Sequence, residues 1–127
     1  MKTKTKFILF IVLIVIAVTI FGILTGSKTE KAGQYDSFAQ CIKSSGAEFY
    51  GTFWCSHCKK QKEEFGTSKD YLPYIECSTE DGKGQLQICK DKGIEGYPTW
   101  VFADNTRLSG ELSFETLSNK TGCQLPK

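Results

Sequence analysis

The stretch Trp54-Cys55-Ser56-His57-Cys58-Lys59-Lys60 decides how the rest of this chain is organised. It follows the apolar run 47–51, which predicts a strand, and leads into the pattern 59–65, which predicts a helix. Two cysteines separated by two residues at such a turn can form a disulfide. Cys55 falls at the helix N-terminus, where free backbone N–H groups and the helix dipole favour a thiolate. Because the thiolate is the form of cysteine that attacks disulfides, the motif predicts a redox site.

Two other uses of a Cys-x-x-Cys pair are metal binding and a structural disulfide. A structural zinc site needs a second pair of ligands at similar spacing. Cys77 and Cys89 lie too far apart for that, and His57 is the only histidine of the chain. A purely structural disulfide fits poorly with Trp54 before the motif and the lysines after it, which indicate a reactive, electropositive site. We therefore predict redox chemistry that needs neither a metal nor another cofactor.

The N-terminal segment predicts a membrane anchor. An apolar run extends from residue 7 to 24, interrupted only by Thr19 and Gly22. Its eighteen residues, at about 1.5 Å each in a helix, span about 27 Å, close to the hydrocarbon thickness of a bilayer. A cleaved signal peptide, which would leave a secreted domain, usually has a shorter apolar region and an Ala-x-Ala-like site. We predict an uncleaved transmembrane helix over 1–26, a tether over 27–34 and one globular domain over 35–127.

Charge and cysteine usage predict where that domain lies. Lysines at positions 2, 4 and 6 precede the apolar run, so we expect a single-pass protein of the cell membrane with a cytoplasmic N-terminus. Six cysteines in so short a chain fit an oxidising, extracytoplasmic compartment. Without the three leading lysines, the 16 basic residues fall to 13 against 14 acidic ones. This balance argues against nucleic acid as a partner and against a polybasic membrane-surface module.

The globular part alternates between helical and extended patterns. Tyr35, Phe38 and Ile42 share one face of a first predicted helix, for which Ser37 and Gln40 resemble a capping box. Further helices are predicted over 59–65 and 85–92 and from Ser113 to 121, and strands over 47–51, 73–77, 99–102 and 107–109. The resulting order is helix, strand, helix, strand, helix, strand, strand, helix, which indicates an α/β domain.

This order, with a redox turn after the first strand and a proline before the third, resembles the thioredoxin pattern. The resemblance is carried by residues 53–58 (Phe-Trp-Cys-Ser-His-Cys) and 96–100 (Gly-Tyr-Pro-Thr-Trp). It implies a mixed central sheet flanked by helices, and a cis bond between Tyr97 and Pro98 that faces the cysteine pair. The residue before a cis-proline exposes backbone groups that can pair with an extended substrate. We expect Trp54, Tyr97 and Pro98 to contact substrate.

A closer resemblance is to the thioredoxin-like domain of bacterial vitamin K epoxide reductase homologues. It is carried by residues 49–58, 73–77, 88–89 and 97–100. In those proteins the domain lies outside the membrane and passes electrons from folding proteins to a quinone-reducing helix bundle. The resemblance implies that Cys55–Cys58 is the exchanging pair and that Cys77–Cys89 is structural. Because this chain has one hydrophobic segment, such a bundle would be a separate membrane redox partner.

Cys41 and Cys123 are the two cysteines left over. The first and last helices of a thioredoxin-like fold can lie near each other at their ends, so by elimination we predict a second structural disulfide between them.

Two positions depart from the thioredoxin pattern. Thioredoxins carry a buried acid six residues before the first cysteine, where this chain has Phe49, and the neighbouring Glu48 would point to the opposite face of the strand. The route of the proton to the resolving thiol is therefore left open. His57 stands between the cysteines, where it can donate to the Cys55 thiolate and make the disulfide more oxidising. The alternative is that His57 is simply an exposed helix residue.

These assignments predict that Cys55 is an exposed nucleophile and Cys58 a buried resolver, with His57 as a third catalytic residue. The predicted function is a membrane-anchored, extracytoplasmic thiol-disulfide oxidoreductase that exchanges disulfides with protein substrates, as an oxidant or isomerase in disulfide formation. The alternatives are a tethered reductase for a dedicated client, such as apocytochrome thiols, and a non-enzymatic binding module.

Overall fold

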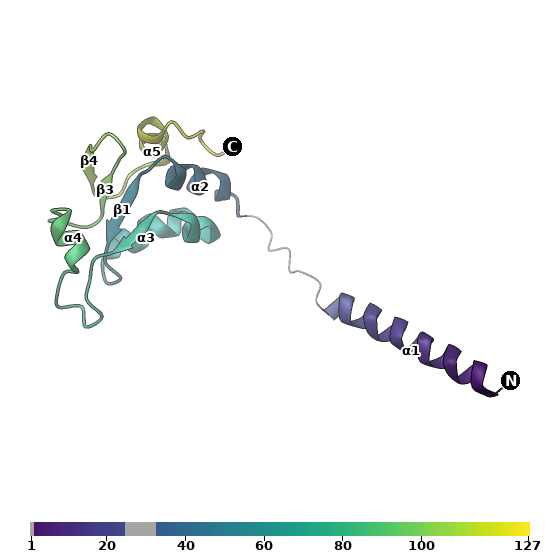
Figure 1. The fold of residues 1–127 in the computed structure, drawn as a ribbon. Helices are drawn as coiled ribbons and strands as arrows, with labels where there is room; N and C mark the ends of the chain where they lie inside the picture. The colour runs from purple at the N-terminus through teal and green to yellow at the C-terminus, as the bar shows by residue number, and fades with distance from the viewer. Residues whose placement is uncertain (1, 25–32) are drawn as a thin grey trace. The chain divides into compact units, whose positions relative to one another are not determined.

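The computed structural model describes residues 2–24 and 33–127, and the chain divides into two compact units, Met1–Lys31 and Ala32–Lys127 (Figure 1). The described part of the first unit is the helix α1 (Lys2–Leu24), whose side chains from residue 6 to 20 are exposed. Within the described residues, no helix has the combination of length and hydropathy that a membrane span requires. The anchor and its boundaries stay predictions, and most of the predicted tether, 27–32, lies outside the described residues.

The second unit follows the predicted order of helices and strands. Its elements are α2 (Asp36–Ser44), β1 (Glu48–Gly51), α3 (Ser56–Glu64), β2 (Tyr74–Glu76), α4 (Gln87–Asp91), β3 (Thr99–Val101), β4 (Arg107–Ser109) and α5 (Phe114–Thr121). A 3-10 helix, η1 (Gly66–Tyr71), was not predicted. The capping box predicted for α2 is wrong, because its N-cap is Tyr35 without a side-chain bond. The cap predicted at Ser113 is confirmed, since its Oγ accepts a bond from Thr116 N.

The strands form one mixed sheet in the order β2-β1-β3-β4. β1 runs parallel to β2 and antiparallel to β3, and β3 pairs antiparallel with β4. Phe49 in the central strand β1 is the register partner of both Tyr74 on β2 and Trp100 on β3. The predicted α/β fold with a mixed central sheet flanked by helices is therefore confirmed.

Alternation along the strands divides the core between the two faces of the sheet. Phe49 and Trp100 stack with their ring centroids 4.5 Å apart on one face. That face belongs to a cluster that includes apolar side chains of α2, α3 and α5. Tyr50 and Val101 point to the other face and pack with Cys77, Cys89 and Ile94. The helix that carries the redox motif, α3, thus packs on the face that holds the buried aromatic stack.

Two disulfides join distant parts of this unit. Cys41 on α2 is bonded to Cys123, just after α5, and their Cα atoms lie 5.8 Å apart. Cys77, just after β2, is bonded to Cys89 on α4, with a Cα separation of 5.6 Å. Both pairings are those expected for the structural cysteines, and they leave Cys55 and Cys58 as free thiols.

Candidate active site

The cysteine motif forms the start of α3. Cys55 is the N-cap residue, and its backbone N–H donates to the Thr52 carbonyl at 3.1 Å. Its sulfur accepts a bond from the Cys58 backbone N–H at 3.3 Å, one of the amides that a helix start leaves without a helical partner. A sulfur at the N-cap therefore receives a hydrogen bond and the positive end of the helix dipole, and both favour a thiolate there.

The two thiols differ in burial, and burial acts on the pKa of Cys58. Cys58 is fully buried, whereas Cys55 keeps 8% of its surface accessible. The prediction that Cys55 is an exposed thiol is wrong, because the turn before α3 and the core around it cover most of the side chain. Burial raises the pKa of Cys58 to about 12, and its hydrogen bond with the Cys55 thiol adds to the increase. Cys55 is thus the sulfur that a substrate reaches more readily, and Cys58 keeps its proton.

Gly51, at the end of β1, makes room for the buried thiol. A Cβ atom at this position would lie 2.9 Å from Cys58 Sγ and 2.8 Å from Cε2 of the Tyr74 ring. Any larger residue would therefore displace one of these side chains. The Tyr74 hydroxyl donates to Glu76 Oε2 at 2.8 Å, and burial together with this bond raises the Tyr74 pKa.

The strand position that holds an acid in thioredoxins brings no carboxylate to Cys58 here. Phe49 is fully buried and stacked on Trp100. Glu48 points to the opposite face, where it accepts bonds from Lys92 Nζ at 2.6 Å and from the Tyr50 hydroxyl at 3.0 Å. The expectation that Glu48 faces away is confirmed.

Two exposed aromatic side chains lie just before Cys55. Phe53 and Trp54 keep 57% and 55% of their surface accessible. Trp54 Nε1 donates to Ser78 Oγ at 2.9 Å, and its ring meets the Tyr97 ring edge to face with centroids 6.0 Å apart. The Phe53 backbone N–H donates to Glu76 Oε1 at 3.2 Å. Hydrogen bonds to β2 and to the segment after it thus hold an apolar surface beside the cysteine motif.

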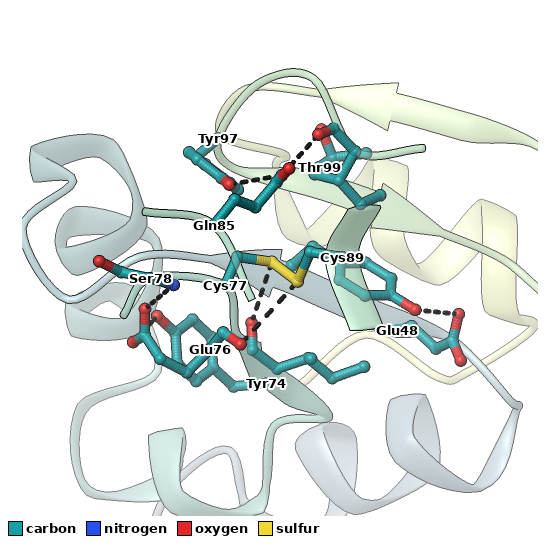
Figure 2. Close-up of a disulfide and its surroundings, with 12 residues drawn as sticks. Glu48, Tyr74, Glu76, Cys77, Ser78, Gln85, Cys89, Tyr97 and Thr99 are labelled. Atoms are coloured by element: carbon teal, nitrogen blue, oxygen red, sulfur yellow. Dashed lines mark hydrogen bonds between the residues drawn. A yellow bond between two sulfur atoms is a disulfide. The ribbon is translucent and has the colours of Figure 1, made fainter. Parts of the chain in front are cut away.

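The predicted substrate residues after α4 are largely shielded from solvent. The Tyr97–Pro98 bond is cis. Tyr97 is half-buried, and its hydroxyl accepts a bond from Gln85 Nε2 at 2.7 Å (Figure 2). Pro98 is buried, and its carbonyl accepts a bond from Gly110 N at 2.9 Å. Substrate contact by these two residues stays a prediction.

The Cys77–Cys89 disulfide stabilises the loop that contacts Trp54 and Tyr97. It is fully buried, and it ties the end of β2 to α4 (Figure 2). The loop between its two cysteines carries Ser78 and Gln85, which hold Trp54 and Tyr97 through their side chains. This disulfide therefore fixes both ends of the loop that positions the aromatic side chains.

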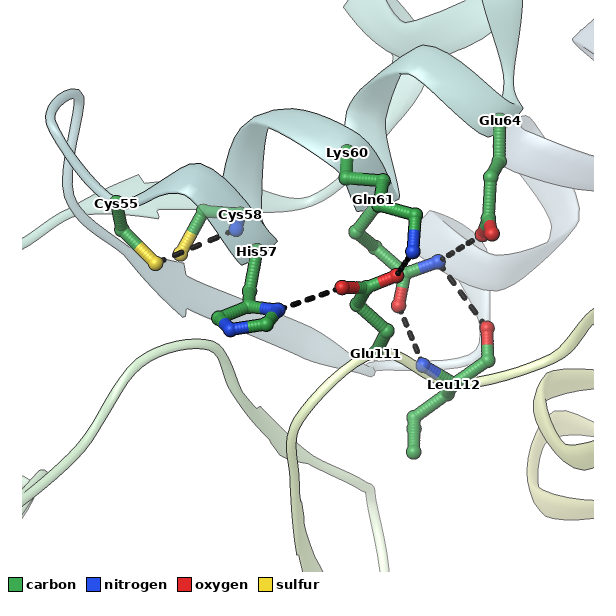
Figure 3. A network of polar contacts seen from close by, with 8 residues as sticks. All are labelled: Cys55, His57, Cys58, Lys60, Gln61, Glu64, Glu111 and Leu112. Carbon is green, nitrogen blue, oxygen red and sulfur yellow. Dashed lines mark hydrogen bonds and ion pairs between the residues drawn. The ribbon is translucent and has the colours of Figure 1, made fainter.

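His57 lies in the first turn of α3. Among the hydrogen bonds of the described residues, none joins the His57 side chain to Cys55. Its Nδ1 lies 2.6 Å from Oε1 of Glu111, the residue two places after β4 (Figure 3). Lys60 Nζ lies 3.0 Å from the other oxygen of the same carboxylate. The hydrogen bonds from His57 and Lys60 hold the pKa of Glu111 below its usual range. The sequence did not identify Glu111, which no motif links to the cysteines.

A buried glutamine fixes the backbone beside Glu111. Gln61 is fully buried on α3, and its Oε1 accepts a bond from Leu112 N at 2.6 Å. Its Nε2 donates to Leu112 O at 3.1 Å and to Glu64 Oε2 at 2.8 Å (Figure 3). Both backbone polar groups of Leu112 are thus bound by one side chain, which holds the segment after β4 against α3.

Comparisons with known proteins agree with this geometry. Residues 29–120 match the family model for thioredoxin. The chain is 43% identical over 93 residues to the thiol-disulfide oxidoreductase LTO1 of Arabidopsis thaliana, covering 70% of this chain and 24% of that protein. It is 34% identical over 88 residues to a probable protein disulfide-isomerase, ER-60, of Schistosoma mansoni, covering 60% of this chain and 17% of the relative. The chain thus spans a quarter or less of the length of these relatives.

Proposed function

Since this chain belongs to the thioredoxin family, we propose that it exchanges disulfides with protein substrates through Cys55 and Cys58. The observation that carries the proposal is the position of Cys55 as N-cap of α3, with its sulfur bound to a backbone N–H. The relatives named as thiol-disulfide oxidoreductase and disulfide-isomerase share this domain with the chain and support the same chemistry.

In the oxidising direction the reaction starts from a Cys55–Cys58 disulfide. A substrate thiolate attacks the Cys55 sulfur, the sulfur–sulfur bond breaks, and Cys58 leaves as a thiolate that takes up a proton. A second substrate thiol then attacks the substrate sulfur of the mixed disulfide and releases Cys55. The substrate loses two electrons and gains a disulfide, and the cysteine pair gains the two electrons and becomes a dithiol.

In the reverse direction Cys55 attacks a substrate disulfide and Cys58 resolves the adduct. Cys58 must lose its proton first, and its pKa of about 12 makes the thiolate scarce at neutral pH. The resolving step is therefore expected to accelerate as the pH rises.

We propose that the physiological direction is oxidation or isomerisation. The exposed Phe53 and Trp54 beside Cys55 support this, because apolar side chains can hold the unfolded segments that such reactions act on. The two further disulfides fit an oxidising compartment. A tethered reductase and a non-enzymatic binding module are the competing functions.

The reduction potential of the full-length chain tests this proposal. The chain would be equilibrated in glutathione buffers and then assayed for oxidation of a reduced, unfolded protein. We expect a potential well above the value of about −270 mV that is typical of thioredoxin, nearer the range of isomerases and oxidants. A value close to −270 mV would indicate the reductase instead. Unchanged activity after Cys55→Ser would indicate a binding module.

We also propose that residues 2–24 anchor the domain at the outer side of the cell membrane. The support is the sequence alone, which places three lysines before an apolar run of eighteen residues. Protease added to intact cells or spheroplasts should remove the domain from the cell surface. Full protection of the domain, or a mature N-terminus near residue 27, would contradict the anchor.

A separate membrane protein of the vitamin K epoxide reductase type is the redox partner that we propose. The support is the resemblance of residues 49–58, 73–77, 88–89 and 97–100 to domains that are fused to such a bundle. This partner would reoxidise the Cys55/Cys58 dithiol. If a Cys58→Ser variant captured substrate proteins in cells but no integral membrane protein, the partner proposal would be wrong.

A further inference from the structure

Glu111 is held in a defined position beside the cysteine motif by contacts of its side chain and of the neighbouring backbone. The bonds from Gln61 to both backbone polar groups of Leu112 fix the chain immediately after Glu111. From this fixed segment the Glu111 side chain, only 20% exposed, reaches the first two turns of α3 and contacts His57 and Lys60 with its two oxygens. These contacts come from segments 51 to 54 residues apart in sequence, so the arrangement depends on the folded domain.

The charges around this carboxylate are arranged as a small network. His57 Nδ1 and Lys60 Nζ face Glu111 from α3, and the partly buried carboxyl of Glu64 lies near enough to interact with it electrostatically. Figure 3 shows that the Nδ1 atom of the His57 ring is directed toward Glu111 and away from Cys55. When the His57 ring carries a positive charge, the Glu111 carboxylate therefore offsets that charge, and its attraction for a Cys55 thiolate is weaker.

We propose that Glu111 is a positioning residue for disulfide exchange, which holds the His57 imidazole through Nδ1 and offsets its charge. It thereby limits how strongly His57 stabilises the Cys55 thiolate. The inference rests on the proposed function and adds to it a residue that sets how oxidising the Cys55–Cys58 disulfide is.

The expected consequence follows from replacing the carboxylate by an amide of the same size. In Glu111→Gln the His57 ring loses its anionic partner, so a protonated ring is free to approach Cys55 and its charge is no longer offset. Both effects favour the thiolate, and a more stable thiolate makes the disulfide more oxidising. Exposed charge pairs have modest energies, so we expect a change of about threefold.

The first measurement is the rate at which iodoacetamide alkylates Cys55 in full-length chains that carry Cys58→Ser. At pH 5.5, where histidine side chains generally carry their charge, Glu111→Gln should react about threefold faster than its parent. The difference should be smaller at pH 8. The matched control is Glu63→Gln, which removes an exposed α3 carboxylate that lies 3.9 Å from Lys59. This control should react at the parental rate.

The second measurement is the equilibrium with glutathione in chains that keep both cysteines. Glu111→Gln should shift the equilibrium constant about threefold toward the reduced chain, which corresponds to about 14 mV at 29.6 mV per tenfold change. In a His57→Ala background the same substitution should have little effect, because the ring that Glu111 positions is missing. A merely structural role for Glu111 would change stability without this dependence on His57.

Two results would overturn the inference. One is a Glu111→Gln chain that matches both its parent and Glu63→Gln in alkylation rate and in potential. The other is an equal change with and without His57, which would show that the carboxylate acts on Cys55 directly. The alkylation rate needs no substrate protein, so a wild-type chain that fails to oxidise thiols would refute the proposed function and leave this test intact.

Discussion

A chain with Cys58→Ser is expected to accumulate mixed disulfides between Cys55 and substrate proteins. When Cys55 attacks a substrate disulfide, the adduct is normally released by Cys58, whose backbone N–H lies 3.3 Å from the Cys55 sulfur. Serine has nearly the same size but cannot attack a disulfide, so the adduct loses its internal route of release. Adducts of higher mass should appear in gels without reductant, disappear with reductant, and contain Cys55 in the linked peptide.

The matched control is Cys55→Ser, which keeps the other thiol of the pair. This variant should trap little and should lose all exchange activity, because Cys58 is fully buried and burial raises its pKa to about 12. Trapping through Cys58 instead would show that the nucleophile is assigned wrongly. The alkylation rate of Cys55 against pH in the Cys58→Ser chain would then report how readily Cys55 ionises.

Local patterns in the sequence predict most of the fold. Phe49 and Tyr50 point to opposite faces of the sheet, as the two-residue period of a strand requires. Ser113 is the N-cap of α5, as its capping side chain predicts. The 3-10 helix Gly66–Tyr71 was missed because its sequence, Gly-Thr-Ser-Lys-Asp-Tyr, has no apolar period. The cap predicted at Ser37 failed because a different local bond formed, in which Asp36 accepts from Gly33 N at 2.7 Å.

The candidate site divides in the same way between local and distant contacts. Cys55, Cys58 and the pair Tyr97–Pro98 belong to short motifs whose chemistry is visible in a few residues. Glu111 and Gln61 do not, because their roles come from bonds between segments more than 50 residues apart. Such contacts depend on where the sheet places the segment after β4 relative to α3, which no local pattern records.

Removing the Cys41–Cys123 disulfide is expected to destabilise the domain strongly. The bridge joins positions 82 residues apart and so encloses most of the globular unit. Closing a loop of that length lowers the entropy of the unfolded chain, which raises the free energy of unfolding by about 4.5 kcal/mol on the chain-entropy estimate. A Cys41→Ala/Cys123→Ala chain should therefore unfold at a much lower urea concentration, as followed by the loss of helical circular dichroism without reductant.

The other disulfide provides the comparison for this prediction. Cys77 and Cys89 are separated by only 12 residues, for which the same estimate gives about 3 kcal/mol. If loop closure dominates, the Cys41/Cys123 double variant should lose more stability than a Cys77→Ala/Cys89→Ala chain.

The Cys41/Cys123 variant should also keep its reactivity at Cys55, because Cys41 lies on α2 and outside the hydrogen bonds that hold α3 and Trp54. The Cys77/Cys89 variant should lose reactivity as well, since that disulfide fixes the loop carrying Ser78 and Gln85. An unfolding midpoint of the Cys41/Cys123 variant equal to that of the wild-type chain would show that the long bridge contributes no stability.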